Sequence, residues 1–136
     1  MSLAIDTNVL VRLLTADDEK QSQLAVTLIR NAYDDGMPVF ISLGVLLETE
    51  WVLRSRYGLP RDAVHHAFTR LLETVELELE APTTVEEALR LFQSEPASDF
   101  ADCMHVAVAL HSGRTLATFD KRAARLAGAV LVTADG

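Results

Sequence analysis

The sequence has little cysteine, no long hydrophobic run and no excess of positive charge, and each absence removes a class of protein. The single cysteine, Cys103, cannot form an internal disulfide and has no second thiol with which to build a zinc site. We expect it to be a small buried residue. No apolar stretch reaches the roughly 18 residues of a membrane span, and residues 1–16 lack the basic start and cleavage site of a signal peptide. The sequence therefore predicts a cytoplasmic protein without a membrane segment.

The net charge of -8 argues against a protein that coats nucleic acid, because phosphate contacts need an excess of lysine and arginine. The charge is unevenly distributed, however. Residues 73–95 hold seven acidic residues and one basic residue, which leaves thirteen acidic and eleven basic residues elsewhere. If several of those acids surround metal ions, the remaining surface is mildly basic. The acidity therefore does not exclude a polyanionic substrate.

The length and the hydrophobic content are those of one compact domain. With 136 residues, 49% of them hydrophobic, the chain can bury a sizeable core. No repeat, low-complexity tract or linker interrupts the sequence. We therefore expect a single domain over residues 1–136.

Short apolar runs alternate with amphipathic helical patterns along the chain. Residues 75–80 alternate apolar and glutamate side chains, which indicates a strand at the edge of a sheet. Alternating strands and helices imply an α/β fold with a mostly parallel sheet covered by helices on both faces. The predicted strands are residues 3–5, 38–42, 75–80, 115–118 and 129–132, and the predicted helices are residues 9–14, 17–35, 43–57, 60–72, 83–92, 99–111 and 121–126.

Two aspartates, Asp6 and Asp120, each follow directly after a predicted strand. Ligands of open parallel sheets bind beyond the carboxyl ends of the strands, so both carboxylates are candidates for a binding crevice. The alternative is that each aspartate only caps the helix that follows it. For either residue alone the two interpretations are equally open, whereas the pair favours a site.

The predicted helix 43–57 offers two glutamates, Glu48 and Glu50, which lie about 200° apart around the helix and cannot share a role. Glu50 stands four residues before Arg54, the spacing of an exposed helical ion pair. Glu48 has mainly apolar neighbours at helical spacing and no basic partner. A buried carboxylate without a partner is costly unless a cation compensates it, so we expect Glu48 to be the functional glutamate.

Asp99 and Asp102 lie three residues apart at the start of a predicted helix, on the face that carries Val106. The alternative is a reciprocal cap, with Asp99 or Ser98 as the N-cap, but this explains one acid better than two. Asp102 lies deeper on the apolar face and is the stronger candidate. His105 is nearby and is either an outer hydrogen-bond donor or a core residue.

A cluster of hard oxygen ligands without a cysteine or histidine set suits Mg²⁺ or Mn²⁺ better than zinc. Carboxylates that hold one or two such ions typically activate water for attack on a phosphodiester. The sequence therefore indicates a metal-dependent nuclease. Two alternatives remain: a Mg²⁺-dependent phosphohydrolase for a small phosphate ester, against which Asn8 stands where a second aspartate is expected, and a metal-free binding or assembly module whose acids only cap helices.

Four motifs, in this order, resemble those of the PIN domain and in particular those of VapC-type toxins. Each is weak evidence alone, but the ordered set is specific and spans nearly the whole chain. The motifs are Asp6-Thr7-Asn8 after the first strand, Leu46-Leu47-Glu48 followed by Trp51-Val52-Leu53, Asp99-Phe100-Ala101-Asp102 at the start of a helix, and Thr118-Phe119-Asp120 after a late strand.

This resemblance implies a three-layer α/β/α fold with a parallel five-stranded sheet in the order 3-2-1-4-5, which brings the ends of strands 1 and 4 together. It also implies an RNA endonuclease that forms a homodimer and is neutralised by a VapB-type antitoxin, whose tail covers the acidic crevice. Carried over by motif, the catalytic metal ligands are Asp6, Glu48, Asp102 and Asp120, the auxiliary acid is Asp99, and the polar supports are Thr7, Asn8 and Thr118.

A short basic cluster, Lys121, Arg122 and Arg125, follows Asp120. It is a candidate contact for RNA phosphates or for an acidic antitoxin tail. It is equally well explained as the solvated face of a short helix.

Overall fold

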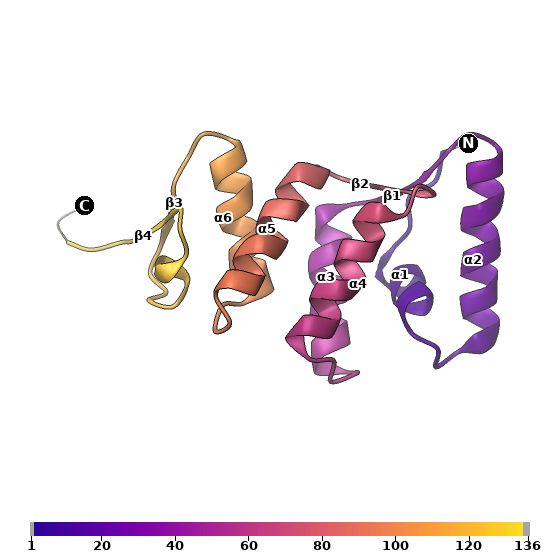
Figure 1. Cartoon of the computed structure of the whole chain (residues 1–136), viewed down its shortest axis with the longest axis horizontal. Coiled ribbons are helices and arrows are strands. Elements are labelled where there is room, and N and C mark those ends of the chain that lie inside the picture. Colours follow the sequence, from indigo (N-terminus) through magenta and orange to yellow (C-terminus); the bar gives the residue numbers. More distant parts are fainter. Residues whose placement is uncertain (1, 135–136) are drawn as a thin grey trace. The chain divides into compact units, whose positions relative to one another are not determined.

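The computed structural model describes residues 2–134, which form helices and short parallel strands (Figure 1). The chain divides into two compact units, Met1–Pro82 and Thr83–Gly136. A single domain over residues 1–136 stays a prediction.

Four helices make up most of the first unit: α1 (Thr7–Leu14), α2 (Glu19–Asp34), α3 (Leu43–Ser55) and α4 (Arg61–Glu73). Local capping explains where they begin and end. Asp18 caps α2 by accepting a hydrogen bond from the Gln21 amide at 3.0 Å, and Gly36 follows the end of this helix at φ 79°, a conformation that favours glycine. The helix predicted over 9–14 starts two residues earlier because Asp6 caps it.

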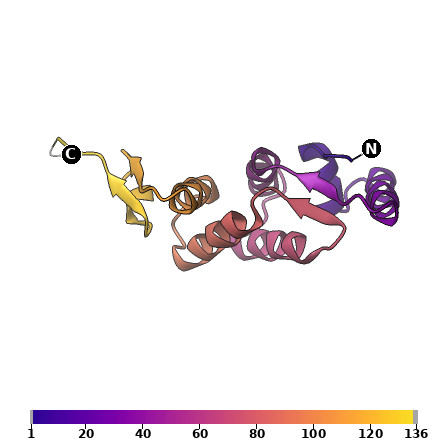
Figure 2. The ribbon, with the colours of Figure 1, turned by 90° about the horizontal axis from the view of Figure 1, so that it is seen from above.

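The strands of the first unit are short and parallel. β1 (Val39–Ile41) pairs with β2 (Leu77–Leu79), with Val39 opposite Leu77. The segment before Asp6 joins the other side of β1 through a parallel bridge between Ala4 and Phe40. β1 therefore lies in the middle and β2 at the edge, as its alternating glutamates predict, and Figure 2 shows β1 and β2 side by side among the helices.

The second unit contains α5 (Pro82–Ser94), α6 (Phe100–His111), β3 (Leu116–Thr118), the 3₁₀ turn η1 (Ala123–Arg125) and β4 (Ala129–Leu131). β3 and β4 pair in parallel, with Leu116 opposite Ala129. Phe92 of α5 and Phe100 of α6 pack edge to face, with their ring centroids 5.4 Å apart. Cys103 is buried beside Ser98, in agreement with its predicted role as a small core residue.

The observed fold is α/β, with a helical majority and parallel strands, as predicted. Within the units the strand neighbours agree with the order 3-2-1 and with the adjacent pair 4-5. A continuous five-stranded sheet is not resolved among residues 2–134, so the pairing of residues 3–5 with β3 stays a prediction. No helix in this part of the chain is long and apolar enough to span a bilayer.

Candidate active site

Asp6 stands where the first extended segment turns into α1. Its Oδ1 accepts a hydrogen bond from the Val9 amide at 3.0 Å, so the capping role considered from the sequence is real. The carboxylate is exposed, and none of the described residues donates a hydrogen bond to its second oxygen. Asp6 and Asn8 line a groove of about 510 Å³ with residues of α2. Capping therefore occupies one oxygen of Asp6 and leaves the other available to a ligand.

Thr7 connects Asp6 to the glutamate of α3. Its side chain is buried, and its hydroxyl donates a hydrogen bond to Oε1 of Glu48. The start of α3 is held by Ser42, which accepts from the Val45 amide, and by Glu80, which accepts from the Leu43 amide at 2.8 Å. The Thr7 hydroxyl is thus placed to orient the Glu48 carboxylate, whereas the Asn8 side chain forms no hydrogen bond with the described residues, and the roles of both as polar supports of the site stay predictions.

The expected burial of the two α3 glutamates is wrong. Glu48 is exposed, and Glu50 is only 5% exposed. Glu50 does form the predicted ion pair with Arg54, with Nε and Oε2 3.0 Å apart. The core-facing stripe of α3 consists of Leu46, Thr49, Glu50 and Leu53, whereas the apolar residues near Glu48 include Trp51, which is 50% exposed. The argument for Glu48 from uncompensated burial therefore fails, and its candidacy rests on the motif and on its contact with Thr7.

The two glutamates make a matched test. We expect Glu48→Gln to lower metal-dependent RNA cleavage by about 10²-fold, because the amide can still accept from Thr7 but lacks the charge that a cation requires. Glu50→Gln should keep the wild-type rate and lose at most about 1 kcal/mol of stability, since its partner Arg54 is half exposed. Cleavage rates and thermal melts of both variants measure this. Loss of activity in Glu50→Gln alone would show that the wrong glutamate had been assigned.

In the second unit, Asp99 and Asp102 occupy the start of α6. Asp99 is the N-cap residue, but its side chain makes no capping hydrogen bond, so the reciprocal cap is not formed. Asp102 lies in the first turn and is half buried, while Asp99 is exposed. Burial raises the pKa of Asp102, and the nearby charges of Asp99 and Asp120 raise it further, against a smaller opposing effect of His105. Asp102 is thus the deeper acid of the two, as predicted.

Asp120 follows β3 and belongs to a tight turn. Its Oδ1 accepts hydrogen bonds from the amides of Arg122 at 2.7 Å and Ala123 at 3.0 Å, and these bonds lower its pKa. Its own amide donates to the Thr118 hydroxyl at 3.0 Å. Thr118 therefore orients the backbone of Asp120. Like Asp6, Asp120 also accepts hydrogen bonds from amides of the turn that follows it, which is the capping role considered from the sequence.

The raised pKa of Asp102 leads to a prediction for the metal-free protein. A carboxylate whose pKa is raised by folding destabilises the native state while it is ionised. This cost is present above the folded pKa and disappears as the pH falls below the unfolded value, 3.8. In EDTA at pH 7, Asp102→Asn should therefore raise the melting temperature by a few degrees, and the gain should shrink as the pH is lowered.

Thermal melts between pH 7 and pH 4 measure this difference. Asp62→Asn, at an exposed acid in the first turn of α4, is the control and should not stabilise the protein. A stability of Asp102→Asn equal to that of the wild type at pH 7 would contradict the raised pKa that burial, and secondarily the charges of Asp99 and Asp120, give to Asp102.

The carboxylate oxygens of the candidate acids are the kind of ligand that suits a hard divalent cation. In the second unit, three aspartates interact electrostatically, and the deepest of them, Asp102, binds protons more readily than usual. In the first unit, Asp6 and Glu48 are joined through Thr7. Within each described unit, no three acidic, histidine or cysteine side chains are gathered closely enough to ligate one ion.

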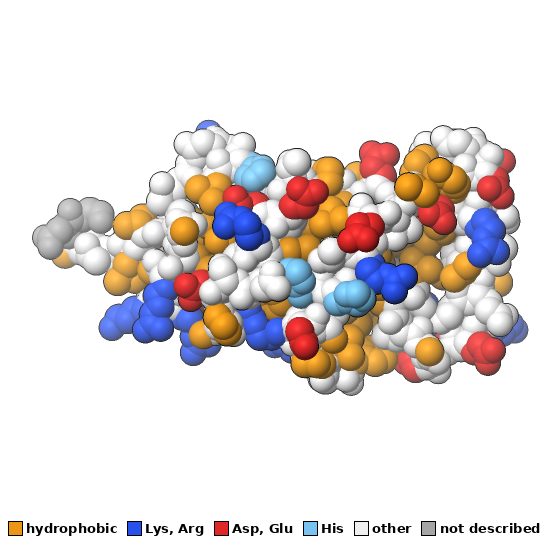
Figure 3. All heavy atoms as spheres, in the orientation of Figure 1, with side chains coloured by type: hydrophobic (Ala, Val, Ile, Leu, Met, Phe, Trp, Pro, Cys, Tyr) orange, Lys and Arg blue, Asp and Glu red, His pale blue; other side chains and the backbone are white. Residues whose placement is uncertain are grey.

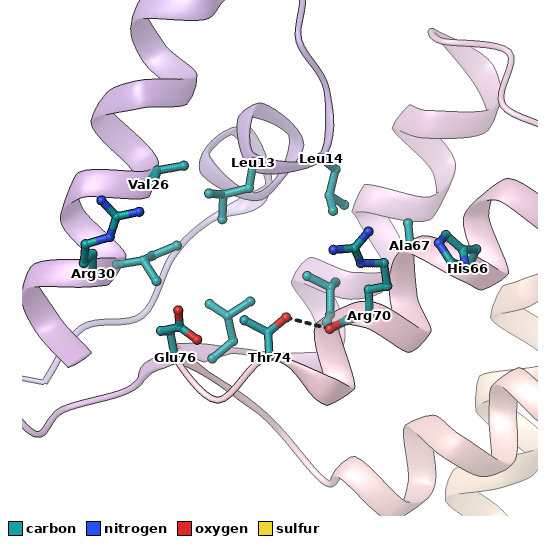
Figure 4. Close-up of a pocket in the computed structure, with 12 residues that line it drawn as sticks. Leu13, Leu14, Val26, Arg30, His66, Ala67, Arg70, Thr74 and Glu76 are labelled. Atoms are coloured by element: carbon teal, nitrogen blue, oxygen red, sulfur yellow. Dashed lines mark hydrogen bonds between the residues drawn. The ribbon is translucent and has the colours of Figure 1, made fainter. Parts of the chain in front are cut away.

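A groove of about 500 Å³ in the first unit was not indicated by the sequence (Figure 4). It lies among α1, α2 and α4 and has apolar walls that include Leu13 and Val26. Arg30 and Arg70 extend into it from opposite sides, and neither guanidinium forms an ion pair or hydrogen bond with the described residues. In the sequence each arginine resembles part of a solvated helix face, and only the tertiary structure shows that both line the same groove.

Comparison with known proteins identifies the family. The sequence matches the model of the PIN domain over residues 3–129, so the chain belongs to the PIN domain family, as its motifs indicate. PIN domains are typically metal-dependent nucleases. Among solved structures, the chain is similar to VapC20, a sarcin-ricin loop cleaving toxin of Mycobacterium tuberculosis, at 23% identity over 91% of this chain and 94% of that chain, with a TM-score of 0.41. No curated protein matches the sequence significantly.

Proposed function

We propose that this PIN domain is a Mg²⁺- or Mn²⁺-dependent endoribonuclease of the VapC type, acting in the cytoplasm. The observation that carries the proposal is the family match over residues 3–129, within which all the candidate acids fall. Supporting it, Asp6 follows an extended segment that bridges in parallel to β1, Asp120 follows the parallel strand β3, and Asp102 lies among like charges that a cation would neutralise.

We assign the metal ligands to Asp6, Glu48, Asp102 and Asp120, with Asp99 as an auxiliary acid. When bound, one or two divalent ions supply an activated water and stabilise charge on the leaving oxygen. Thr7 holds the Glu48 carboxylate, and Thr118 holds the turn that carries Asp120. Asp102 must lose its proton before it can act as a ligand, so cleavage should weaken at acidic pH.

The experiment that tests this function compares substrates and metals. With Mn²⁺ present, the purified chain should cleave a structured RNA internally and leave p-nitrophenyl phosphate intact. Hydrolysis of p-nitrophenyl phosphate without RNA cleavage would favour a small-molecule phosphohydrolase. Absence of both activities, together with no heat of Mn²⁺ binding in a calorimetric titration, would favour a metal-free binding module.

We also propose a homodimer and a VapB-type antitoxin as partners. Arg30 and Arg70, which have no ion-pair partner among residues 2–134 and line the apolar groove, and the exposed cluster Lys121, Arg122 and Arg125 are both suited to acidic segments. Expression of the chain should arrest growth, and co-expression of the neighbouring gene should restore it. Growth arrest that persists in the presence of that gene, under conditions where both proteins accumulate, would contradict the antitoxin assignment.

A further inference from the structure

Phe119 is the most exposed large hydrophobic residue in the described part of the chain. Its side chain is 82% exposed, and it stands between the end of β3 and the candidate ligand Asp120. Single hydrophobic residues on a surface are common and need no function. Phe119 differs from such residues in two ways: hydrogen bonds hold the backbone on both sides of it, and exposed basic residues follow it in the sequence.

The backbone on both sides of Phe119 is held by hydrogen bonds. The Thr118 carbonyl accepts from the Val132 amide at 2.8 Å, and the Thr118 hydroxyl accepts from the Asp120 amide at 3.0 Å. On the other side, the Asp120 carboxylate accepts from two amides of the following turn. The phenyl ring is therefore presented to solvent by a short, fixed segment.

Positive charge follows directly after the ring. Lys121, Arg122 and Arg125 are all exposed, while Ala123 and Leu126 anchor the same turn with exposures of 1% and 2%. Figure 3 shows basic side chains gathered over the end of the second unit that carries η1. An exposed ring flanked by cations is the combination that binds single-stranded nucleic acid, because bases stack on the ring and phosphates contact the cations.

We propose that Phe119 is a stacking platform for an unpaired base of the RNA, with Lys121, Arg122 and Arg125 contacting the adjacent phosphates. This inference rests on the proposed ribonuclease function and specifies its substrate class: RNA that is single-stranded at the bound nucleotide. In a duplex, neighbouring base pairs already cover the faces of each base, so the ring would gain no stacking partner. Since Asp120 is the next residue, the stacked base would lie beside this candidate ligand of the second unit.

The experiment measures binding in EDTA, where cleavage is blocked, to a fluorescein-labelled single-stranded oligoribonucleotide and to its blunt duplex. Phe119→Leu keeps an apolar side chain but removes the ring, and we expect it to weaken single-strand binding by about 5- to 100-fold. Phe119→Trp should bind as tightly as the wild type. Neither variant should change duplex binding or thermal stability, because the ring is exposed.

A variant of Arg122 separates the contribution of stacking to RNA binding from the contribution of positive charge. Arg122→Ala should weaken binding of both RNAs and reduce the salt dependence, whereas Phe119→Leu should leave the salt dependence unchanged. Equal binding of single-stranded RNA by Phe119→Leu and the wild type would overturn the inference, as would an equal loss in Phe119→Trp. A change of oligomeric state in Phe119→Leu with unaltered RNA binding would assign the ring to a protein interface instead.

The outcomes also distinguish this inference from the function on which it rests. A wild-type protein that cleaves RNA with Mn²⁺, and whose Phe119→Leu variant has the same KM and kcat, retains its proposed function and loses only the stacking platform. A wild-type protein that neither cleaves nor binds RNA overturns both.

Discussion

Asp6→Asn will lower the rate of RNA cleavage by about a thousand-fold while leaving the thermal stability unchanged or slightly raised. The asparagine side chain keeps the oxygen that accepts from the Val9 amide, and asparagine caps helices as well as aspartate does. Only the negative charge is lost. The capping role and the proposed ligand role of Asp6 are thereby separated in one substitution.

Asp6→Ala is the matched control. It removes the cap as well as the charge and should cost about 0.5–2 kcal/mol of stability, in addition to the loss of cleavage. Rates on a structured RNA and melting temperatures of the three proteins provide the comparison. If Asp6→Asn cleaved RNA at the wild-type rate, Asp6 would be a helix cap only and the proposed ligand set would be wrong.

Excess EDTA will abolish cleavage, and Mn²⁺ added in excess of the chelator will restore it. The proposed ligands occur in both units, so replacing a ligand in either unit should weaken Mn²⁺ binding. We expect the heat of Mn²⁺ binding to be lost in Asp6→Asn, from the first unit, and in Asp102→Asn, from the second. Glu50→Gln should bind Mn²⁺ as the wild type does, because its carboxylate already has Arg54 as its partner.

Two results would count against this assignment. Wild-type cleavage that persists in EDTA would refute the metal requirement. Mn²⁺ binding that survives in Asp6→Asn but not in Asp102→Asn would confine the ion to the second unit, where Asp99, Asp102 and Asp120 interact.

Most helix positions were predicted well because their signals are local, although the helix predicted over residues 121–126 is only a 3₁₀ turn over Ala123–Arg125. A cap such as Asp18 and a stop such as Gly36 act within one turn of the helix that they delimit, so α2 begins and ends within two residues of its predicted range. Strands were less well delimited. Each observed strand is three residues long, because pairing with a neighbour, and not the apolar run itself, decides which residues count as strand.

The α3 glutamates show where the sequence is insufficient. A helical wheel gives the angle between Glu48 and Glu50 but not the direction of the core, and α3 has apolar residues on more than one face. The neighbouring elements decide that Glu50 is buried and Glu48 exposed. The contact of Thr7 with Glu48, 41 positions away along the chain, is likewise a consequence of packing.

By itself, the sequence determined the alternation of strands and helices, the chemistry of the acids and the PIN motifs, because these depend on residue type and on short spacings. Tertiary structure decided which glutamate faces the core, that the Asp99 side chain leaves its helix uncapped, and that Phe119 is presented to solvent on a fixed turn. The physical reason is that burial and long-range hydrogen bonds depend on how two elements pack against each other, and the residues of one element do not determine which element it packs against.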